Sequence, residues 1–187
     1  MKLTTRKRPA EKKCEVNRLR REGFIPAVIY RRGKAAENIS VSTLEYNALL
    51  RGVEPGRLST KIFTLSDENG VSRKAVLKEV QYNIINYNVI HLDFEELHED
   101  TELKINIPIE CTGVADCKGI KLGGALRQPI RTLKVKCFPK DIPEVFYLDV
   151  KPLELYDKCR LSDLEIPASI RPLAHNMNEV VAVIVKR

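Results

Sequence analysis

Tryptophan is absent from the 187-residue sequence, and tyrosine and phenylalanine together make up only 6% of it. Long apolar runs are absent too: one of the longest, 180–185, is far too short to span a bilayer as a helix. Residues 1–25 contain no apolar segment of the signal-peptide kind. These absences predict a cytoplasmic protein that neither crosses a membrane nor is secreted. Hydrophobic residues still supply 43% of the chain, which is enough for a packed core.

Cysteine and histidine are few and scattered. The five cysteines are an odd number and none forms a C-x-x-C pair, which argues against a disulfide framework and against a compact zinc site. Cys137 falls in a strand-like run, so we expect it to be a small core residue. The sequence therefore predicts reduced thiols, no metal and no cofactor.

The common motifs of several enzyme classes are missing as well. There is no phosphate loop, no G-x-G-x-x-G and no G-x-S-x-G nucleophile elbow. The glycine-rich segment 119–124 lacks the strand-loop-helix context of a phosphate-binding loop, so we interpret it as a flexible loop.

Positive charge is concentrated in one part of the chain. Residues 1–34 hold twelve Lys or Arg against three Glu, a charge of +9, whereas residues 35–187 sum to −2. A basic segment beside a nearly neutral body is typical of a protein that binds a polyanion such as nucleic acid. A solvated basic tail is the alternative. A membrane surface is disfavoured because residues 1–22 have no clear apolar face to insert.

An acidic stretch at 95–102 divides the chain into two expected domains, 1–97 and 98–187. In the first, strands are predicted at 24–30, 38–42, 61–65, 73–81 and 89–94. Pro26 indicates an edge or the start of its strand, and Asn69-Gly70 indicates a hairpin turn. A helix is expected over 44–51, capped by Ser42 or Thr43 with a possible capping box from Glu45, and with Leu44, Ala48, Leu49 and Leu50 on one face.

The second domain is expected to contain short strands at 103–109, 132–137, 145–149 and 180–186, with one helical turn near 162–164. The fold class predicted for the whole chain is mainly β, of the α+β type. It consists of a small N-terminal β-barrel with helices, followed by a separate β-rich C-terminal domain.

Two residues apart in the strand expected at 89–94, His91 and Asp93 should project from one face. They are consistent with a catalytic base and its orienting carboxylate, with a surface pair, or with recognition of a nucleotide by a stacking or donating His91 and an accepting Asp93. No nucleophile is placed beside them by the sequence, which disfavours catalysis.

Three stretches of the first half resemble signatures of the ribosomal large-subunit protein 25 family. Residues 17–30 (NRLRREGFIPAVIY) resemble its R-x-L-R-x-x-G-x-[IV]-P-[AG]-V-[IV]-Y-G motif. Residues 78–81 (KEVQ) and 91–94 (HLDF) are similar to its K-x-[VI]-Q and H-[VIL]-D-F strands, with fitting spacing. The second half resembles the extra β domain of the long CTC type of this family. The match begins with P-[IV]-x-x-x-G at 108–113 and continues with Lys121, Gly123-Gly124 and Gln128. Further matching segments are 135–139, 141–144, 149–150 and 162–164.

This resemblance implies a non-catalytic constituent of the large ribosomal subunit that binds 5S rRNA in the central protuberance. The implied partners are 5S rRNA and neighbouring large-subunit ribosomal proteins, without a small-molecule substrate or a membrane. Residues 6–8 are interpreted as a tail that becomes ordered on binding. The RNA-binding residues expected from the matched motifs and the basic segment are Lys12, Lys13, Arg18, Arg20, Arg21, Tyr30, Arg31, Lys78, Gln81, His91 and Asp93.

The chain departs from the family pattern at two places. Arg31, followed by Arg32, replaces the glycine that usually follows the tyrosine, which predicts a looser turn or added phosphate contacts. The small residues of the loop before Arg18 are replaced by 14–17 (CEVN), and Glu15 is expected to point away from RNA.

Two other functions stay open at this point. One is a stress-related protein whose C-terminal domain binds a protein partner off the ribosome, because the CTC type is named after a general stress protein. The other is an enzyme that uses His91 and Asp93.

Overall fold

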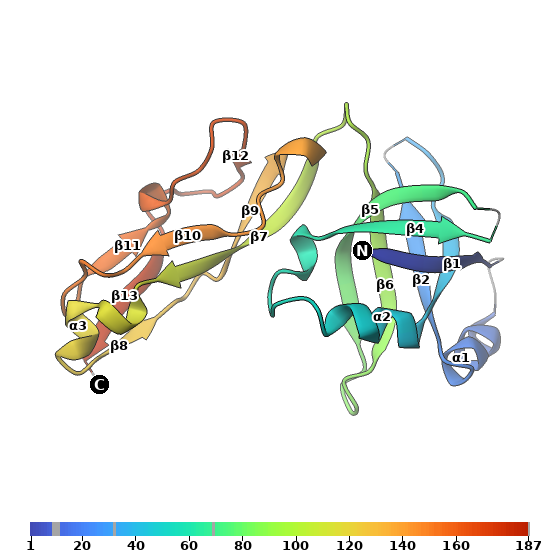
Figure 1. The fold of residues 1–187 in the computed structure, drawn as a ribbon, viewed down its shortest axis with the longest axis horizontal. Helices are drawn as coiled ribbons and strands as arrows, with labels where there is room; N and C mark the ends of the chain where they lie inside the picture. The colour runs from blue at the N-terminus through green and yellow to red at the C-terminus, as the bar shows by residue number, and fades with distance from the viewer. Residues whose placement is uncertain (9–11, 32, 69, 187) are drawn as a thin grey trace. The chain divides into compact units, whose positions relative to one another are not determined.

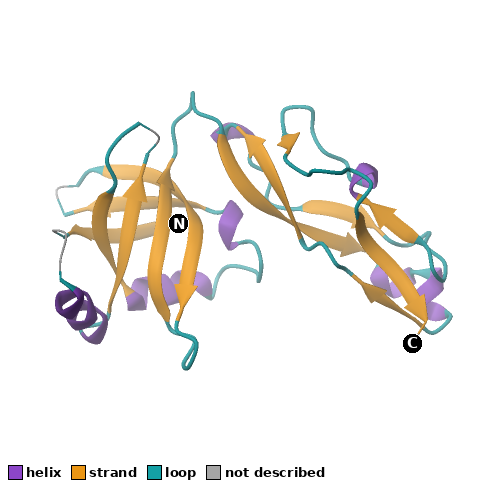
Figure 2. Ribbon diagram, turned by 180° about the vertical axis from the view of Figure 1, so that it is seen from behind, coloured by secondary structure: helices purple, strands orange, loops and turns teal. Residues whose placement is uncertain are grey.

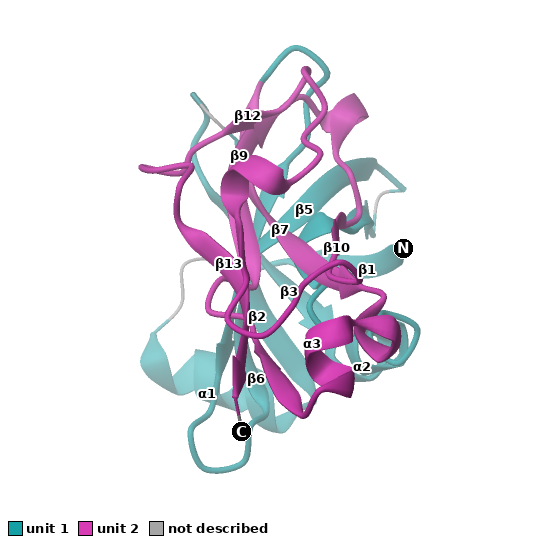
Figure 3. Cartoon of the chain, turned by 90° about the vertical axis from the view of Figure 1, so that its left-hand side faces the viewer, with its two compact units in different colours: residues 1–101 teal, residues 102–187 magenta. Residues whose placement is uncertain are grey.

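The computed structural model describes residues 1–8, 12–31, 33–68 and 70–186. Strands dominate the chain and only short helices lie between them (Figure 1 and Figure 2). The chain divides into two compact units, unit 1 with residues 1–101 and unit 2 with residues 102–187 (Figure 3). The predicted mainly β fold, with an N-terminal barrel and a β-rich C-terminal part, is confirmed. Arg32 and Asn69, on which parts of two expected turns depended, lie outside the described residues.

Unit 1 is a closed barrel with the strand order β1-β3-β2-β6-β5-β4. Its strands are β1 (Lys2–Lys7), β2 (Phe24–Tyr30), β3 (Glu37–Ser42), β4 (Ile62–Asp67), β5 (Ser72–Tyr82) and β6 (Val89–Glu96). The pairs β1–β4 and β2–β6 are parallel, and the other neighbours are antiparallel. Helix α1 (Lys13–Arg21) precedes β2, α2 (Thr43–Leu50) follows β3, and a 3-10 turn, η1 (Leu58–Thr60), precedes β4.

Alternation of side chains fills the barrel. Every second residue of β2 and β6, such as Ile25, Ala27, Leu92 and Phe94, points inward and is buried. Phe94 meets Phe63 edge-to-face, with ring centroids 5.8 Å apart. The residues between them point outward, so the outer face of these strands is the part available for function.

Pro26 does not lie on an edge strand, but it lies near the start of its strand, which was the other position expected for it. Its strand β2 lies between β3 and β6 in a barrel without free edges. Pro26 is opposite Ser40 of β3, while the ladder with β6 begins one residue later, at Ala27 and Leu92. Pro26 has no backbone N–H to donate, but it is not paired with any residue of β6, so the β2–β6 ladder loses no pair.

Arg6 and Lys7 belong to β1 and not to a tail. Leu3 and Thr5 of this strand are buried in the barrel, and Thr5 is opposite Val41 of β3. Its other partner strand, β4, lies some 60 residues further along the chain, with Lys2 opposite Thr64. Sequence patterns missed β1 because the pairing is not local.

The expected apolar face of α2 was right for Leu49 and Leu50, which pack partly buried against the barrel core, and wrong for Leu44 and Ala48. Leu44 is 82% exposed and Ala48 is exposed, whereas Tyr46 is fully buried against the barrel core. The Glu45 carboxylate does not close a capping box: it accepts a hydrogen bond from the Thr4 amide of β1 at 2.9 Å. The contact with β1 therefore decides which side of the helix faces inward.

Unit 2 contains a four-stranded sheet, β10-β7-β9-β12, and a three-stranded sheet, β11-β13-β8. Its strands are β7 (Leu103–Thr112), β8 (Gly124–Arg127), β9 (Thr132–Cys137), β10 (Phe146–Asp149), β11 (Lys158–Arg160), β12 (Arg171–Pro172) and β13 (Val180–Lys186). The helical pieces are α3 (Lys118–Lys121) and three 3-10 turns, η2 (Val114–Asp116), η3 (Pro139–Asp141) and η4 (Leu161–Asp163). Cys137 is buried as predicted, and all five cysteines are free.

The segment 119–124 is not a flexible loop. Gly119 is a buried residue of α3, and Gly124 begins β8. A Cβ at Gly119 would lie 2.9 Å from both the carbonyl carbon and the oxygen of Glu154. These glycines therefore allow two backbones to approach closely.

Candidate RNA-binding surface

The predicted residues of β6 lie on the outer face of the barrel. His91, Asp93 and Glu95 are partly exposed and alternate with the buried Leu92 and Phe94. This confirms that His91 and Asp93 share one face of a strand. Helical or loop backbone at this position would have separated them.

The neighbouring strands bring further predicted residues to this face. Gln81 of β5 is directly opposite His91 of β6. On the other side, Val28 of β2 is in register with Asp93, and Tyr30 is in register with Glu95. Neighbouring strands lie about 4.8 Å apart, so Gln81 and His91 are adjacent and Tyr30 borders the same surface. We call the outer positions of β2, β6 and β5 the polar face.

His91 and Asp93 are in direct contact. Nδ1 of His91 lies 2.6 Å from Oδ1 of Asp93, and the two side chains are 22% and 29% exposed. Both atoms are buried and have no hydrogen-bond partner within the described chain, so this is a close ion-pair contact without hydrogen-bond geometry. The carboxylate lies against Nδ1, so Nε2 is the ring nitrogen left for a ligand.

Tyr30 carries a phenol that stays protonated over a wide pH range. Partial burial raises its pKa above the ordinary value, and the negative charges of Glu95, Asp93 and Glu79 raise it further. A protonated phenol can donate a hydrogen bond to a phosphate or a base acceptor.

Lys78 lies where the β5–β6 ladder shifts register, between Leu77 and Glu79. Its Nζ is 2.6 Å from Oε2 of Glu95, and both side chains are 21% exposed. The structure thus places Lys78 beside the polar face as a cation already engaged with a carboxylate.

Helix α1 borders the polar face through Arg20. The Nε and Nη2 groups of Arg20 donate to the carbonyl oxygen of Ile90 at 3.2 and 3.0 Å, and Nη1 donates to Oδ1 of Asn17 at 3.1 Å. Ile90 immediately precedes His91. The fork of the guanidinium therefore ties the helix to the start of β6 and holds one fixed positive charge next to His91.

The other predicted cations lie along α1 and at the end of β2. Arg18 forms an (i, i+4) pair with Glu22 at 3.5 Å, and Nε of Arg21 donates to the Asn17 carbonyl at 3.4 Å. Lys12 and Lys13 are exposed at the beginning of α1, and Arg31 directly follows β2. These charges surround the polar face along α1 and the end of β2, but the structure ties none of them to His91 as it ties Arg20.

The segment 14–17 forms the first turns of α1 and not a loop, so that expectation was wrong. The Lys12 amide donates to Oε2 of Glu15 at 3.3 Å. Glu15 therefore covers the N-terminal end of the helix, where a carboxylate is favoured by the helix dipole.

Sequence reasoning missed a polar hollow of about 420 Å³ beside Arg20 and Arg21. It is formed by α1, α2 and the turn between β5 and β6, and its amide and phenol groups come from Asn47, Tyr82, Asn83, Asn86, Tyr87 and Asn88. The backbone amides of Ile85 and Asn88 donate hydrogen bonds to Oδ1 of Asn83 and of Asn86, at 2.9 and 3.1 Å, and these bonds order the turn. The density of Asn and Tyr in 82–88 was the signal that could have identified it.

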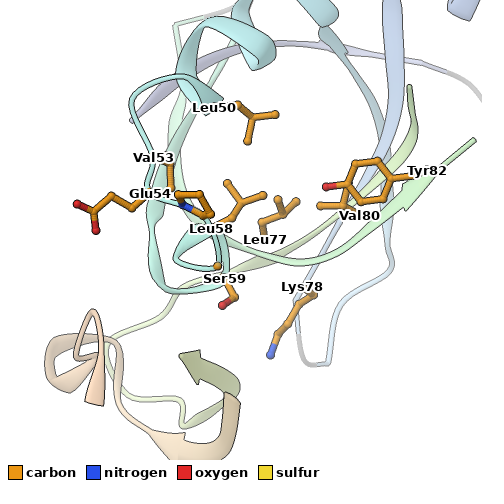
Figure 4. Close-up of a pocket in the computed structure, with 11 residues that line it drawn as sticks. Leu50, Val53, Glu54, Leu58, Ser59, Leu77, Lys78, Val80 and Tyr82 are labelled. Atoms are coloured by element: carbon orange, nitrogen blue, oxygen red, sulfur yellow. The ribbon is translucent and has the colours of Figure 1, made fainter. Parts of the chain in front are cut away.

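A second pocket, of about 490 Å³, lies between η1, the loop before it and β5 (Figure 4). Leu50, Val53, Leu58, Leu77 and Val80 make its lining largely apolar. No group of three or more metal-ligating side chains occurs among the residues that the structure describes. Similarly, none of the described helices is long and apolar enough to cross a membrane.

Comparison with known proteins covers the whole chain. Residues 2–94 match the model of the Ribosomal L25p family, and residues 102–187 match the model for the C-terminal domain of ribosomal protein TL5. Proteins named "Large ribosomal subunit protein bL25" are 44% identical in Chlamydia muridarum and 46% identical in Chlamydia caviae and Chlamydia abortus, each over 100% of both chains. The chain therefore belongs to the bL25 family of ribosomal proteins, in its long form with the TL5-type C-terminal domain, and not to a family of enzymes.

Proposed function

We propose that this protein is a constituent of the bacterial large ribosomal subunit that binds 5S rRNA in the central protuberance. In this proposal residues 1–97 form the RNA-binding domain, residues 98–187 form a separate domain, and neighbouring large-subunit proteins are further partners. The single observation that carries the proposal is the polar face, where Gln81, His91 and Asp93 stand together beside the tethered Arg20.

The chemistry of this face suits double-stranded RNA. A-form RNA displays a wide, shallow minor groove lined by 2′-hydroxyls, and its major-groove edges are out of reach. Asp93 can accept from a hydroxyl, while His91, Gln81 and Tyr30 can donate to base or sugar acceptors. The arginines and lysines of α1 supply phosphate contacts, which position the protein without reading sequence.

A titration of the full chain and of residues 1–101 against 5S rRNA and an unrelated duplex RNA of equal length, at two salt concentrations, tests the proposal. We expect both proteins to bind 5S rRNA selectively and to keep that selectivity at the higher salt concentration. Equal, salt-sensitive binding of both RNAs would contradict it, because a basic surface without a specific site behaves in that way.

A further inference from the structure

We propose a second phosphate-binding surface, on unit 2: the outer face of strands β7, β9 and β12, which we call the basic face, contacts the backbone of double-stranded RNA. The inward residues of β7 and β9, among them Ile105 and Val135, are buried, so the residues between them form the opposite face of the sheet. Those outer positions carry Lys104, Lys134, Lys136 and Arg171.

The strand register aligns three of these cations in one row. Lys104 of β7 is opposite Lys136 of β9, and Lys136 is opposite Arg171 of β12. Lys134 occupies the next outer position of β9. Steps of about 4.8 Å between strands and about 7 Å along a strand place the four charges in a compact patch.

Such a row is unfavourable in the free protein, because like charges directly opposite each other in a sheet are destabilising. Lys136 is balanced by a close ion pair with Glu102. Lys134 and Arg171 are exposed and form no ion pair with any other described residue. Binding of an anionic backbone would remove this repulsion.

The basic face adjoins a hollow and ends before the first acidic residue on the outer side of β7. A hollow of about 440 Å³ lies beside it, lined by Lys136, Arg171, Pro172, Leu173, Ala174 and His175. The first acidic residue along the outer side of β7 is Glu110, opposite Tyr147 of β10 and about 20 Å from Lys104. The basic face therefore covers one end of the sheet and not the whole of it.

RNA fits this surface better than a protein partner does. Four cations dominate the basic face, and Leu173 of the adjoining hollow is 38% exposed, whereas protein interfaces are depleted of lysine at their centre. The chain belongs to a ribosomal protein family, in which RNA phosphates are the abundant polyanion. The inference uses unit 2 and that family membership, and does not depend on the 5S rRNA site proposed for unit 1.

Residue-resolved NMR on the isotope-labelled full chain tests it. The probe is an RNA duplex of unrelated sequence and about 16 base pairs, a length that double-stranded-RNA-binding modules span. The variant K104Q/K134Q/R171Q is compared with K118Q/K121Q/K158Q, which removes the same charge from α3 and β11 of the same unit. Unchanged spectra away from the substitutions verify that both variants fold.

In the unchanged chain we expect saturable chemical-shift changes at Lys104, Lys134 and Arg171 when the duplex is added. The affinity for the duplex should fall at least about tenfold in K104Q/K134Q/R171Q only. In that variant the slope of log affinity against log salt concentration should also be shallower by about 2 to 3. Equal losses in the two variants would overturn the proposal, and so would shifts confined to unit 1. Shifts on the basic face with large-subunit proteins but not with duplex would assign it to a protein partner instead. Adding 5S rRNA to the same sample tests the unit 1 site separately, through chemical-shift changes in β5 and β6. A failure of that site is therefore distinguishable from a failure of the basic face.

Discussion

The imidazole of His91 and the carboxylate of Asp93 face each other across 2.6 Å on the outer side of β6. The carboxylate holds the ring in one orientation, and Gln81 stands next to it on β5. The pair resembles a catalytic base with its orienting group, but neither residue lines the two pockets described above, and the chain belongs to a family of ribosomal proteins. Its role in our proposal is recognition.

Asp93→Asn and His91→Ala should each weaken 5S rRNA binding by about tenfold, because a hydrogen bond between a charged group and its partner contributes about 1.5–3 kcal/mol. The double variant should lose much less than the sum, since the two side chains act as a unit. Affinity is measured by filter binding, with circular dichroism verifying the fold.

The C-terminal end of β6 provides a matched control. His98 and Glu96 form a second histidine–carboxylate pair at 3.8 Å, with similar exposure of 31% and 20%. His98→Ala and Glu96→Gln should leave 5S rRNA affinity unchanged. An equal loss in these variants would mean that the His91–Asp93 pair has no special role.

Arg20→Lys should weaken 5S rRNA binding by roughly three- to tenfold while leaving the salt dependence unchanged. Lysine keeps the charge but cannot donate from two nitrogens to the Ile90 carbonyl as Arg20 does. Arg51→Lys, at the C-terminal end of α2, is the control and should bind normally. Wild-type affinity of Arg20→Lys would show that only the charge matters.

Tyr46→Phe should leave unit 1 as stable as before or more stable by up to about 1–3 kcal/mol, because a buried hydroxyl without a partner is unfavourable. The Tyr46 hydroxyl is buried and has no hydrogen-bond partner in the described chain. Urea unfolding at neutral pH measures the change. A clear loss of stability would mean that an ordered water satisfies this hydroxyl.

Tyr46→Phe should also change how the free energy of unfolding depends on pH in the alkaline range. Burial raises the pKa of Tyr46 well above its ordinary value, and Tyr82 adds to the shift. Above about pH 10 the unfolded chain ionises this tyrosine and the folded chain does not, so the free energy of unfolding falls as pH rises. Tyr46→Phe should lessen this fall, whereas Tyr87→Phe, at a 79% exposed position, should not.

Gly119→Ala should destabilise unit 2 by about 1–3 kcal/mol, since the added methyl group meets the backbone of Glu154 at 2.9 Å. Gly52→Ala is the control, because its Cβ would have only an ordinary contact, 3.6 Å from the Leu49 oxygen. We expect that change to stay within about 1 kcal/mol. Thermal unfolding followed by circular dichroism measures both, and equal effects would contradict a packed role for Gly119.

Local sequence patterns were sufficient to predict most strands of the barrel. The strand at β2 and the strand at β6 were recognisable because alternate apolar residues fill the core, and that alternation also places His91 and Asp93 together. The same reasoning failed for β1, whose partners β3 and β4 are distant in sequence. For α2 it placed Leu49 and Leu50 against the core but missed Tyr46, which is fully buried there.

The sequence by itself determined the mainly β class, the basic segment at 1–34, the shared face of His91 and Asp93, and the family resemblance, because each depends on residues close together in the chain. Only the tertiary structure decided that Arg20 is tied to Ile90, that Gln81 stands opposite His91, and that Lys104, Lys136 and Arg171 form one row. These relationships join residues up to 70 positions apart. The physical reason is that strand register depends on the burial of whole faces across the sheet, which no single segment specifies.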